Sequence, residues 1–317
     1  MPYSNQSVAT VLAEINFGST VAEQDTLLET ARVETLVFSD LLNDRIDLIP
    51  GTKGSGKSAL YRIFVDFLAT RLLNHNKVVV AHGVQQVGDN VFLIYKDHFE
   101  KLSEDDFVSF WCIYLVSLAH EQFVKQPKFA GHLRECGKEI AAFKTACSRC
   151  GIPEIKAPQG LQGVIGWVLS VLKSWRPKIS YQPPIPDAGT YTFDLFGNAD
   201  EQQATLPDSG PPIPHYVEDV KVSLEAILKK TGLSLWLMID RLDEIFPRRS
   251  ALETRALRGL LRTLRIFQSE AVRIKVFLRD DIFEQVVRGG EGFTALTHVT
   301  ARMSDTLRWG EDQILTM

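Results

Sequence analysis

A glycine-rich segment has the residue types and the spacing of a phosphate-binding loop. Residues 51–58 read Gly-Thr-Lys-Gly-Ser-Gly-Lys-Ser, which matches the pattern G-x-x-x-x-G-K-[ST] at every position. Glycines let the backbone turn so that successive N–H groups point inward, and the start of the following helix adds its positive dipole. In this pattern the lysine reaches the β- and γ-phosphates of a nucleotide, and the last hydroxyl binds Mg²⁺.

We therefore predict a site for ATP and Mg²⁺ in this loop, with GTP left open, and we expect the bound nucleotide to be hydrolysed. Ser58 is the predicted magnesium ligand from the loop. The predicted nucleotide contacts are consecutive: Gly51, Thr52, Lys53, Gly54, Ser55, Gly56, Lys57, Ser58 and Ala59.

A second group of chemically capable residues follows an apolar run at 233–239. Asp240 ends this run, where open α/β sheets bind ligands, and it can hold the Mg²⁺ shell as a Walker B aspartate does. Asp243 and Glu244 lie just beyond, and either carboxylate can orient the attacking water as a general base. We favour Glu244, with Asp243 as a close competitor. An acidic cap on the following loop is the structural alternative for Asp240 and Glu244.

Arg279 ends another apolar run, at 273–278. A polar residue at this place lies beside the γ-phosphate in many P-loop ATPases, and an arginine stabilises the charge that develops in phosphoryl transfer. The structural alternative is an ion pair of Arg279 with Asp280 or Asp281.

Strands that alternate with helices position these residues. We predict strands at 45–50, 77–81, 233–240 and 273–278, with a last short strand at 297–301. Helices are expected at 57–73, 103–124, 128–148, 160–175, 216–230, 251–268 and 281–288, and Ser103 is an expected N-cap that accepts from Asp106. The pattern predicts an α/β fold with a mostly parallel sheet covered by helices.

The chain divides into three predicted parts. Residues 1–85 hold an N-terminal segment and the glycine-rich loop, residues 86–229 form a largely helical insertion, and residues 230–317 hold the other half of the core. Eight prolines between 176 and 215 indicate a long irregular excursion. Residues 304–317 have the pattern of a beginning helix, so we expect the chain to continue into a further region.

The composition excludes several classes of protein. The 317 residues are 45% hydrophobic and 23% charged with a net charge of −4, which is not the balance of a polybasic membrane or nucleic-acid binder. We find no secretory signal at 1–16, and the apolar run 107–118 is too short to span a bilayer. The four cysteines are too few for a disulfide scaffold, so we expect a cytoplasmic protein.

Two weaker patterns leave alternatives open. Four arginines recur at three- and four-residue spacing and form a basic stripe on one helical face: Arg255, Arg258, Arg262 and Arg265. The stripe can contact nucleic-acid phosphate or a neighbouring subunit, or it can be a solvated face. Four potential zinc ligands are His132, Cys136, Cys147 and Cys150, although free thiols are the simpler interpretation.

The run Ile-Asp-Arg-Leu-Asp-Glu at 239–244 resembles the Walker B motif of the STAND class of signal-transduction ATPases, some relatives of which serve in phage defence. The segment from Phe17 to Asp25 is similar to the stretch that precedes the P-loop in related bacterial ATPases. The resemblance covers about 15–85 and 230–317. Arg241 stands at a position that is often small in the class.

The resemblance implies an AAA-related ATPase core, a homo-oligomer and a separate effector region. It implies that Phe17 lies near the adenine, that Arg279 is a sensor arginine, and that Arg288 is an arginine finger for a neighbour's γ-phosphate. The expected function is an ATP-driven oligomerisation or conformational switch in a bacterial signalling or defence protein. The alternatives are a DNA-remodelling ATPase, a small-molecule kinase and a nucleotide switch that does not hydrolyse.

Overall fold

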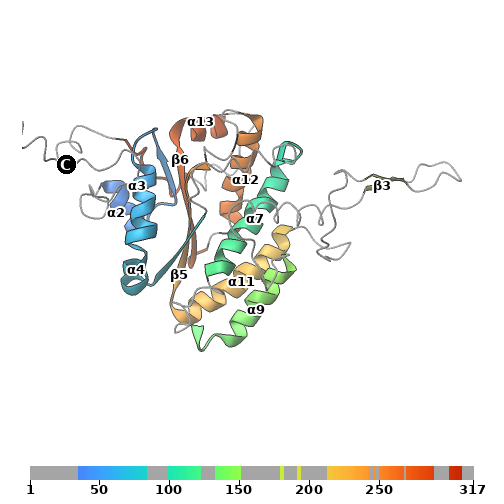
Figure 1. Cartoon of the computed structure of the whole chain (residues 1–317), viewed down its shortest axis with the longest axis horizontal. Coiled ribbons are helices and arrows are strands. Elements are labelled where there is room, and N and C mark those ends of the chain that lie inside the picture. The colour runs from blue at the N-terminus through green and yellow to red at the C-terminus, as the bar shows by residue number, and fades with distance from the viewer. Residues whose placement is uncertain are drawn as a thin grey trace, which may run out of the picture.

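The computed structural model shows an α/β fold built on a four-stranded parallel sheet (Figure 1). The strands lie in the order β1-β6-β5-β2, and all three neighbouring pairs are parallel. Their bounds are Leu48–Gly51 for β1, Val78–His82 for β2, Ser234–Ile239 for β5 and Val272–Arg279 for β6. The described residues are 35–83, 99–122, 133–150, 179–181, 191–193, 213–242, 246, 250–267, 269–288 and 300–308.

The register brings the C-terminal ends of three strands to one edge of the sheet. Gly51 of β1 lies opposite Arg279 of β6, and Ile239 of β5 lies opposite Val276 of β6. The predicted strands at 45–50, 77–81, 233–240 and 273–278 are thereby confirmed in kind, with ends that shift by one to three residues. The loop after β1 and the residue after β5 therefore share an edge, with β6 between them.

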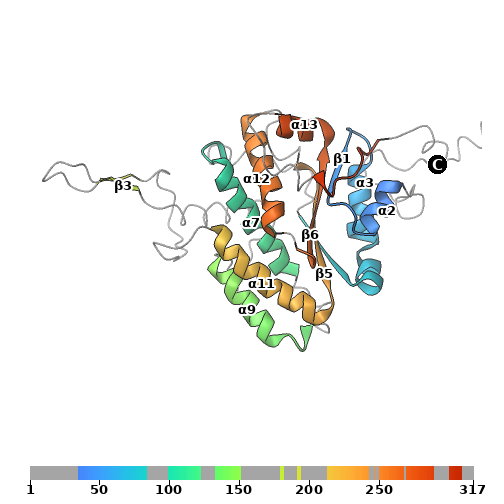
Figure 2. The same ribbon diagram turned by 180° about the vertical axis from the view of Figure 1, so that it is seen from behind.

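Alternate residues of the strands feed two apolar cores. Leu235, Leu237 and Ile239 of β5 pack on one face, while Trp236 and Met238 pack on the other. A sheet that is covered on both faces explains why its strands are almost continuously apolar. Figures 1 and 2 show α2 (Leu36–Leu42) and α3 (Lys57–Arg62) on one side, and α7 (Glu104–His120), α11 (Ile213–Thr231) and α12 (Ala251–Phe267) on the other.

The helix that follows the glycine-rich loop is not one regular α-helix as predicted for 57–73. It runs from α3 into a π-helical turn η2 (Ile63–Phe67), then through α4 (Ala69–Arg71) into a second π-helical turn η3 (Leu72–Asn76). Lys77 ends the run in a left-handed conformation, with a φ of 56°. Hydrophobic spacing alone does not distinguish a π turn from an α turn, which is why the prediction missed both.

Helices from the predicted insertion share the larger core with the sheet. The Ser103 cap of α7 is confirmed, because its hydroxyl accepts from the amide of Asp106, and the Asp106 carboxylate accepts from the amide of Ser103. Helix α7 lies close to α12, where the Trp111 indole donates to the carbonyl of Ala256 at 2.8 Å. A Cβ on Gly259 would come within 2.6 Å of the Cβ of Phe107, so this contact requires glycine.

Two predictions in the middle of the chain need correction, and a third is not tested. A turn at 134–135 interrupts the helix predicted at 128–148, so that α9 spans Gly137–Arg149, while residues 128–132 lie outside the described residues. The excursion at 176–215 contains two short antiparallel strands, β3 (Ile179–Tyr181) and β4 (Tyr191–Phe193), and α11 begins within it at Ile213. The predicted helix at 160–175 lies outside the described residues.

The last strand predicted at 297–301 is not found at 300–301, and residues 297–299 lie outside the described residues. Residues 300–302 are not extended, whereas Met303 forms a parallel bridge with Leu48 and Leu307 forms one with Gly51. The amide of Ser304 donates to Leu48, and the amide of Leu307 donates to Pro50. The start of the segment at 304–317 is therefore extended beside β1 rather than helical, because it satisfies the open edge of that strand.

Charged residues fill the other end of β1 and β6. Lys275 is fully buried and donates to the Asp47 carboxylate at 2.7 Å, to the carbonyl of Ile46 at 2.7 Å and to the Asp44 carboxylate. Arg302 donates to Asp47 at 2.5 Å and contacts Asp44. Burial lowers the pKa of Arg302, but hydrogen bonds and charge from the two aspartates outweigh it and raise the pKa overall. We call Asp44, Asp47, Lys275 and Arg302 the basal ion cluster.

None of the helices in the described part of the chain is long and apolar enough to cross a membrane.

Candidate active site

The glycine-rich loop connects β1 to α3 at the C-terminal edge of the sheet. Gly54 and Gly56 have φ values of 78° and 87°, a region that side chains with a Cβ rarely enter. Gly51 has a different reason to be glycine, because a Cβ there would lie 2.6 Å from Ser55 Oγ and 3.0 Å from Lys57 Cγ. The sequence therefore places its three glycines where the backbone has to turn or has to pass close to the loop's own side chains.

Lys57 folds back over the start of the loop. Its ammonium donates to the carbonyl of Gly51 at 2.8 Å and to the carbonyl of Thr52 at 2.7 Å. An ammonium held at these carbonyls stands at the mouth of the turn, where it can exchange a carbonyl for a phosphate oxygen. Lys57 and Ser58 begin α3, and both are partly exposed, as a ligand requires.

Two further contacts fix the base of the loop. The amide of Thr52 donates to the carbonyl of Leu307 at 3.1 Å, and the amide of Ser55 donates to the carbonyl of Thr52 at 3.2 Å. Leu307 is buried, and its Cβ would lie 3.1 Å from a Cβ on Gly51. Sequence reasoning missed Leu307, because it lies more than 250 positions from the loop and belongs to no motif.

Ser55 points inward at the loop's underside. Its side chain belongs to a residue that is 5% exposed, and within the described residues its hydroxyl has no hydrogen-bond partner. A buried hydroxyl without a partner costs free energy, on the order of 1–3 kcal/mol.

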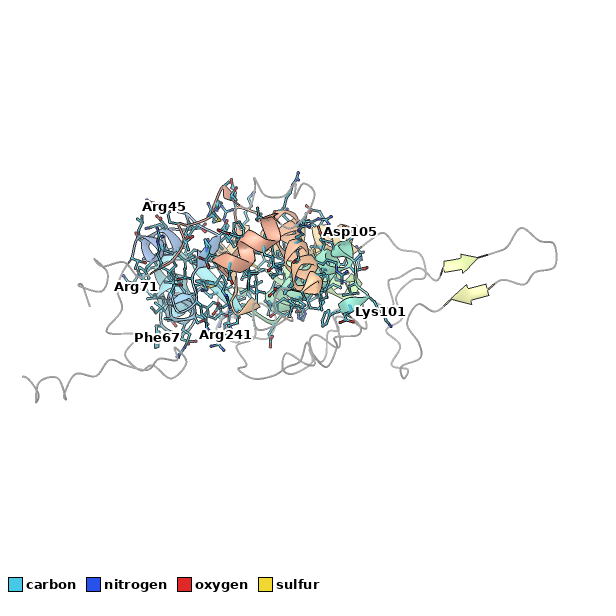
Figure 3. All side chains as sticks on the ribbon, turned by 90° about the horizontal axis from the view of Figure 1, so that it is seen from above. Arg45, Phe67, Arg71, Lys101, Asp105 and Arg241 are labelled. Atoms are coloured by element: carbon cyan, nitrogen blue, oxygen red, sulfur yellow. The ribbon has the colours of Figure 1, made fainter. Side chains whose placement is uncertain are left out.

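Asp240 follows β5 directly and is partly buried at the same edge. Arg241, the next residue, has a φ of 60°, which costs a residue with a Cβ roughly 1–2 kcal/mol. This conformation gives a physical reason why a small residue suits that position. Figure 3 shows the Arg241 side chain at the outside of the molecule, on the same side as Phe67. Strained backbone at a strand end is common at functional sites.

The residues present fit a magnesium ion of the kind that a bound nucleotide carries. A hydroxyl from Ser58 and a carboxylate from Asp240 are oxygen ligands, which Mg²⁺ prefers, and both belong to this edge. The described residues contain no group of three or more His, Cys, Asp or Glu placed to hold a metal.

Arg279 lies opposite Gly51 in the sheet, so its strand end adjoins the loop. Its guanidinium makes a two-point ion pair with Asp281, at 3.0 and 2.7 Å, and its side chain is 16% exposed. The structural alternative of an ion pair with Asp281 is thus observed. The position beside the loop is observed as well, so the prediction that Arg279 senses the γ-phosphate stays open.

The basic stripe on α12 is largely engaged within the chain. Arg255 donates to the carbonyl of Glu100 at 3.1 Å, and Arg258 donates to the carbonyl of Val286 at 3.0 Å. Arg262 pairs with Glu104 and Asp105 at 3.0 and 2.8 Å. These contacts brace α12 against neighbouring helices, whereas Arg265 is exposed. Contact with nucleic acid stays a prediction.

Arg288 is the last residue of α13 (Asp280–Arg288). The bond from Arg258 to Val286 holds the C-terminal turn of that helix. A role for Arg288 in a neighbouring subunit stays a prediction.

The cysteines are buried thiols. Cys112, Cys136, Cys147 and Cys150 are all free and buried. Burial raises the pKa of Cys112 and of Cys150 to about 12, and it also raises the pKa values of Cys136 and Cys147. Burial thus favours the neutral thiol, in which form a cysteine packs as a small apolar residue. The zinc alternative stays a prediction.

Four predicted site residues lie outside the described residues. They are Phe17 at the predicted adenine site, Asp243 and Glu244 as candidate bases, and His132 as a candidate zinc ligand. Their roles stay predictions.

Comparison of the chain with known protein families, with curated proteins and with solved structures finds no match.

Proposed function

We propose that this protein is a P-loop ATPase whose Mg²⁺-dependent binding and hydrolysis of ATP drives an oligomerisation or conformational switch. The observation that carries the proposal is the meeting of three separate segments at one sheet edge. They are the loop 51–58, Asp240 after β5 and Arg279 at the end of β6. A phosphate-binding loop needs a metal ligand and a cation nearby, because a metal ion and cationic side chains balance the charge of a nucleotide.

The residues divide the work in a simple way. The loop backbone and Lys57 bind the phosphates, while Ser58 and Asp240 would hold Mg²⁺, which would supply positive charge to the phosphate groups when bound. Glu244, or Asp243 in its place, orients the attacking water and takes its proton. Arg279 stabilises the developing charge after exchanging its ion pair with Asp281 for the γ-phosphate.

The order of the strands supports the assignment of Arg279. A sensor residue has to reach the γ-phosphate, so its strand has to lie next to the strand that leads into the loop. β6 pairs with β1 and places Arg279 opposite Gly51. β5 then lies one strand further, with Asp240 directly after its last residue.

A signalling or phage-defence role for the switch, with a homo-oligomer and an effector region, rests on the resemblance of residues 239–244 to the STAND class. Completion of the site by Arg288 of a second copy would couple hydrolysis to assembly.

Steady-state phosphate release tests the proposal. The assay follows phosphate from Mg–ATP and Mg–GTP over a range of protein concentrations, with and without double-stranded DNA. We expect specific activity that rises with protein concentration and does not depend on DNA. Turnover that requires DNA would favour a DNA-remodelling ATPase, and binding without turnover would favour a non-hydrolysing switch.

A further inference from the structure

We propose that the ion pair between Arg302 and Asp47 is a clamp that sets the shape of the phosphate-binding loop from the opposite end of β1. The two residues act through the extended segment 302–307, and they are positioning residues rather than catalytic ones. The inference rests on the proposed function for its consequence, namely nucleotide affinity, but the clamp itself is visible in the contacts of the described residues.

The clamp begins at the base of β1. Arg302 Nε lies 2.5 Å from Asp47 Oδ2, and the carbonyl of Arg302 accepts from the amides of Asp47 and Leu48 at 2.7 and 3.2 Å. The side chain and the backbone of one residue therefore hold the same turn of chain. Lys275, buried beside them, donates to the other carboxylate oxygen of Asp47 at 2.7 Å. Asp47 cannot move without uncovering a buried cation, which fixes the position of Arg302.

A ladder of backbone bonds runs from this clamp to the loop. The amide of Ser304 donates to Leu48 at 3.0 Å, the amide of Leu307 donates to Pro50 at 2.8 Å, and the amide of Thr52 donates to Leu307 at 3.1 Å. The first two bonds hold segment 302–307 on the edge of β1. The third bond crosses into the loop, so the position of Leu307 determines the direction of the peptide between Gly51 and Thr52.

The carbonyl of that peptide, which belongs to Gly51, accepts a hydrogen bond from the Lys57 ammonium. The Lys57 ammonium is held by the carbonyls of Gly51 and Thr52, and the Leu307 side chain backs Gly51 from beneath. A slip of segment 302–307 would remove both the support under Gly51 and the acceptor for Thr52. The carbonyls that hold Lys57 would then lose their orientation. The ion pair between Arg302 and Asp47 thus keeps segment 302–307 in register with β1 and with the loop.

The experiment compares Arg302→Ala and Arg302→Lys with Arg45→Ala in the full chain. Arg45 is a matched control, because it also precedes β1 and pairs with an aspartate, but its side chain is 68% exposed and its partner, Asp40, lies outside the basal ion cluster. Figure 3 shows Arg45 at the outside of the molecule. Amide hydrogen exchange at Thr52, Ser304 and Leu307 is measured first, with the amides of β5 as an internal reference for global opening.

We expect Arg302→Ala to accelerate exchange at Thr52 and Leu307 while the β5 amides keep their rates, and to weaken Mg–ATP binding roughly 3- to 30-fold. Arg302→Lys should recover part of both effects, and Arg45→Ala should show neither. Unchanged exchange at Thr52 in Arg302→Ala would overturn the clamp, as would equal acceleration at every amide, since that indicates a general loss of stability.

The two proposals fail in different ways. If the wild-type protein binds no nucleotide, the proposed function is wrong, and the exchange rates still decide whether Arg302 sets the loop. If the wild type binds Mg–ATP and Arg302→Ala binds it equally well despite faster exchange at Thr52, the proposed function stands and the positioning role is wrong.

Discussion

The two ends of β1 and β6 carry charged residues in very different surroundings. At the basal end Lys275 is fully buried, and its ammonium is satisfied by two aspartates and a carbonyl. At the other end Lys57 is partly exposed, and its ammonium donates to backbone carbonyls of a glycine-rich turn. At one end of these strands a buried cation is thus neutralised by carboxylates, and at the other end a partly exposed cation contacts uncharged carbonyls.

The different surroundings of Lys275 and Lys57 predict different roles, stability for the basal ion cluster and ligand binding for the loop. A buried cation surrounded by carboxylates has no capacity left for a ligand, and removing one partner leaves an uncompensated charge in the core. A cation that rests on carbonyls beside exposed groups can exchange them for an anion at small cost. We therefore expect loss of the fully buried Lys275 to change mainly the free energy of unfolding, and substitutions of Lys57 or Glu244 to change nucleotide binding or turnover.

Lys275→Met should have the largest effect on stability. It keeps the stem of the side chain, removes the ammonium and leaves the buried carboxylate of Asp47 with Arg302 as its remaining ion-pair partner among the described residues, so we expect a loss of about 3–5 kcal/mol. Urea unfolding followed by circular dichroism measures it. Arg45→Met, at an exposed ion pair, is the control and should change the stability by less than about 1 kcal/mol. If Lys275→Met loses no more stability than Arg45→Met, the proposed difference between the two ends of the strands is wrong.

Glu244→Gln should slow hydrolysis on the order of 10²-fold or more, with ATP binding and stability retained, because the amide cannot take a proton from the attacking water. Single-turnover phosphate release measures the chemical step. Asp243→Asn is the matched variant and should keep most of the rate. Full turnover in Glu244→Gln would remove this residue from the mechanism and move the role to Asp243.

Ser55→Ala should have the smallest effect, and in the opposite direction. The substitution removes a buried hydroxyl that has no partner among the described residues, so we expect stability to stay the same or to rise by about 1 kcal/mol. Nucleotide affinity should not change. A drop in affinity would show instead that the hydroxyl meets the ligand, and that the underside of the loop belongs to the site.

The sequence predicts the loop at the C-terminal end of β1 far better than it predicts the basal ion cluster at the other end of β1 and β6. The loop 51–58 is a local pattern, and the strands before it and before Asp240 are continuous apolar runs, so their positions follow from short windows. The register that places Arg279 opposite Gly51 does not, because pairing depends on contacts between segments far apart in the chain.

The basal ion cluster could not be predicted for the same reason. Lys275 lies in a strand of otherwise mainly apolar residues, and this is a signal that it needs buried partners. Those partners are 228 and 231 positions away, and nothing local identifies them. The displaced last strand has a related cause. β-branched residues favoured 297–301, whereas the open edge of β1 selects 303–307. In each case a tertiary contact outweighs local preference.

The central claim is that the loop 51–58 binds Mg–ATP, and equilibrium titration calorimetry tests it most directly. Wild type, Lys57→Ala and Lys229→Ala are titrated with Mg–ATP at equal protein concentration, since Lys229 is an exposed lysine on α11, which packs on the far face of the sheet from the loop's helix α3. We predict saturable binding by the wild type and by Lys229→Ala, and affinity lower by about 10- to 100-fold in Lys57→Ala. No binding by the wild type, or equal affinity in all three proteins, would contradict the account.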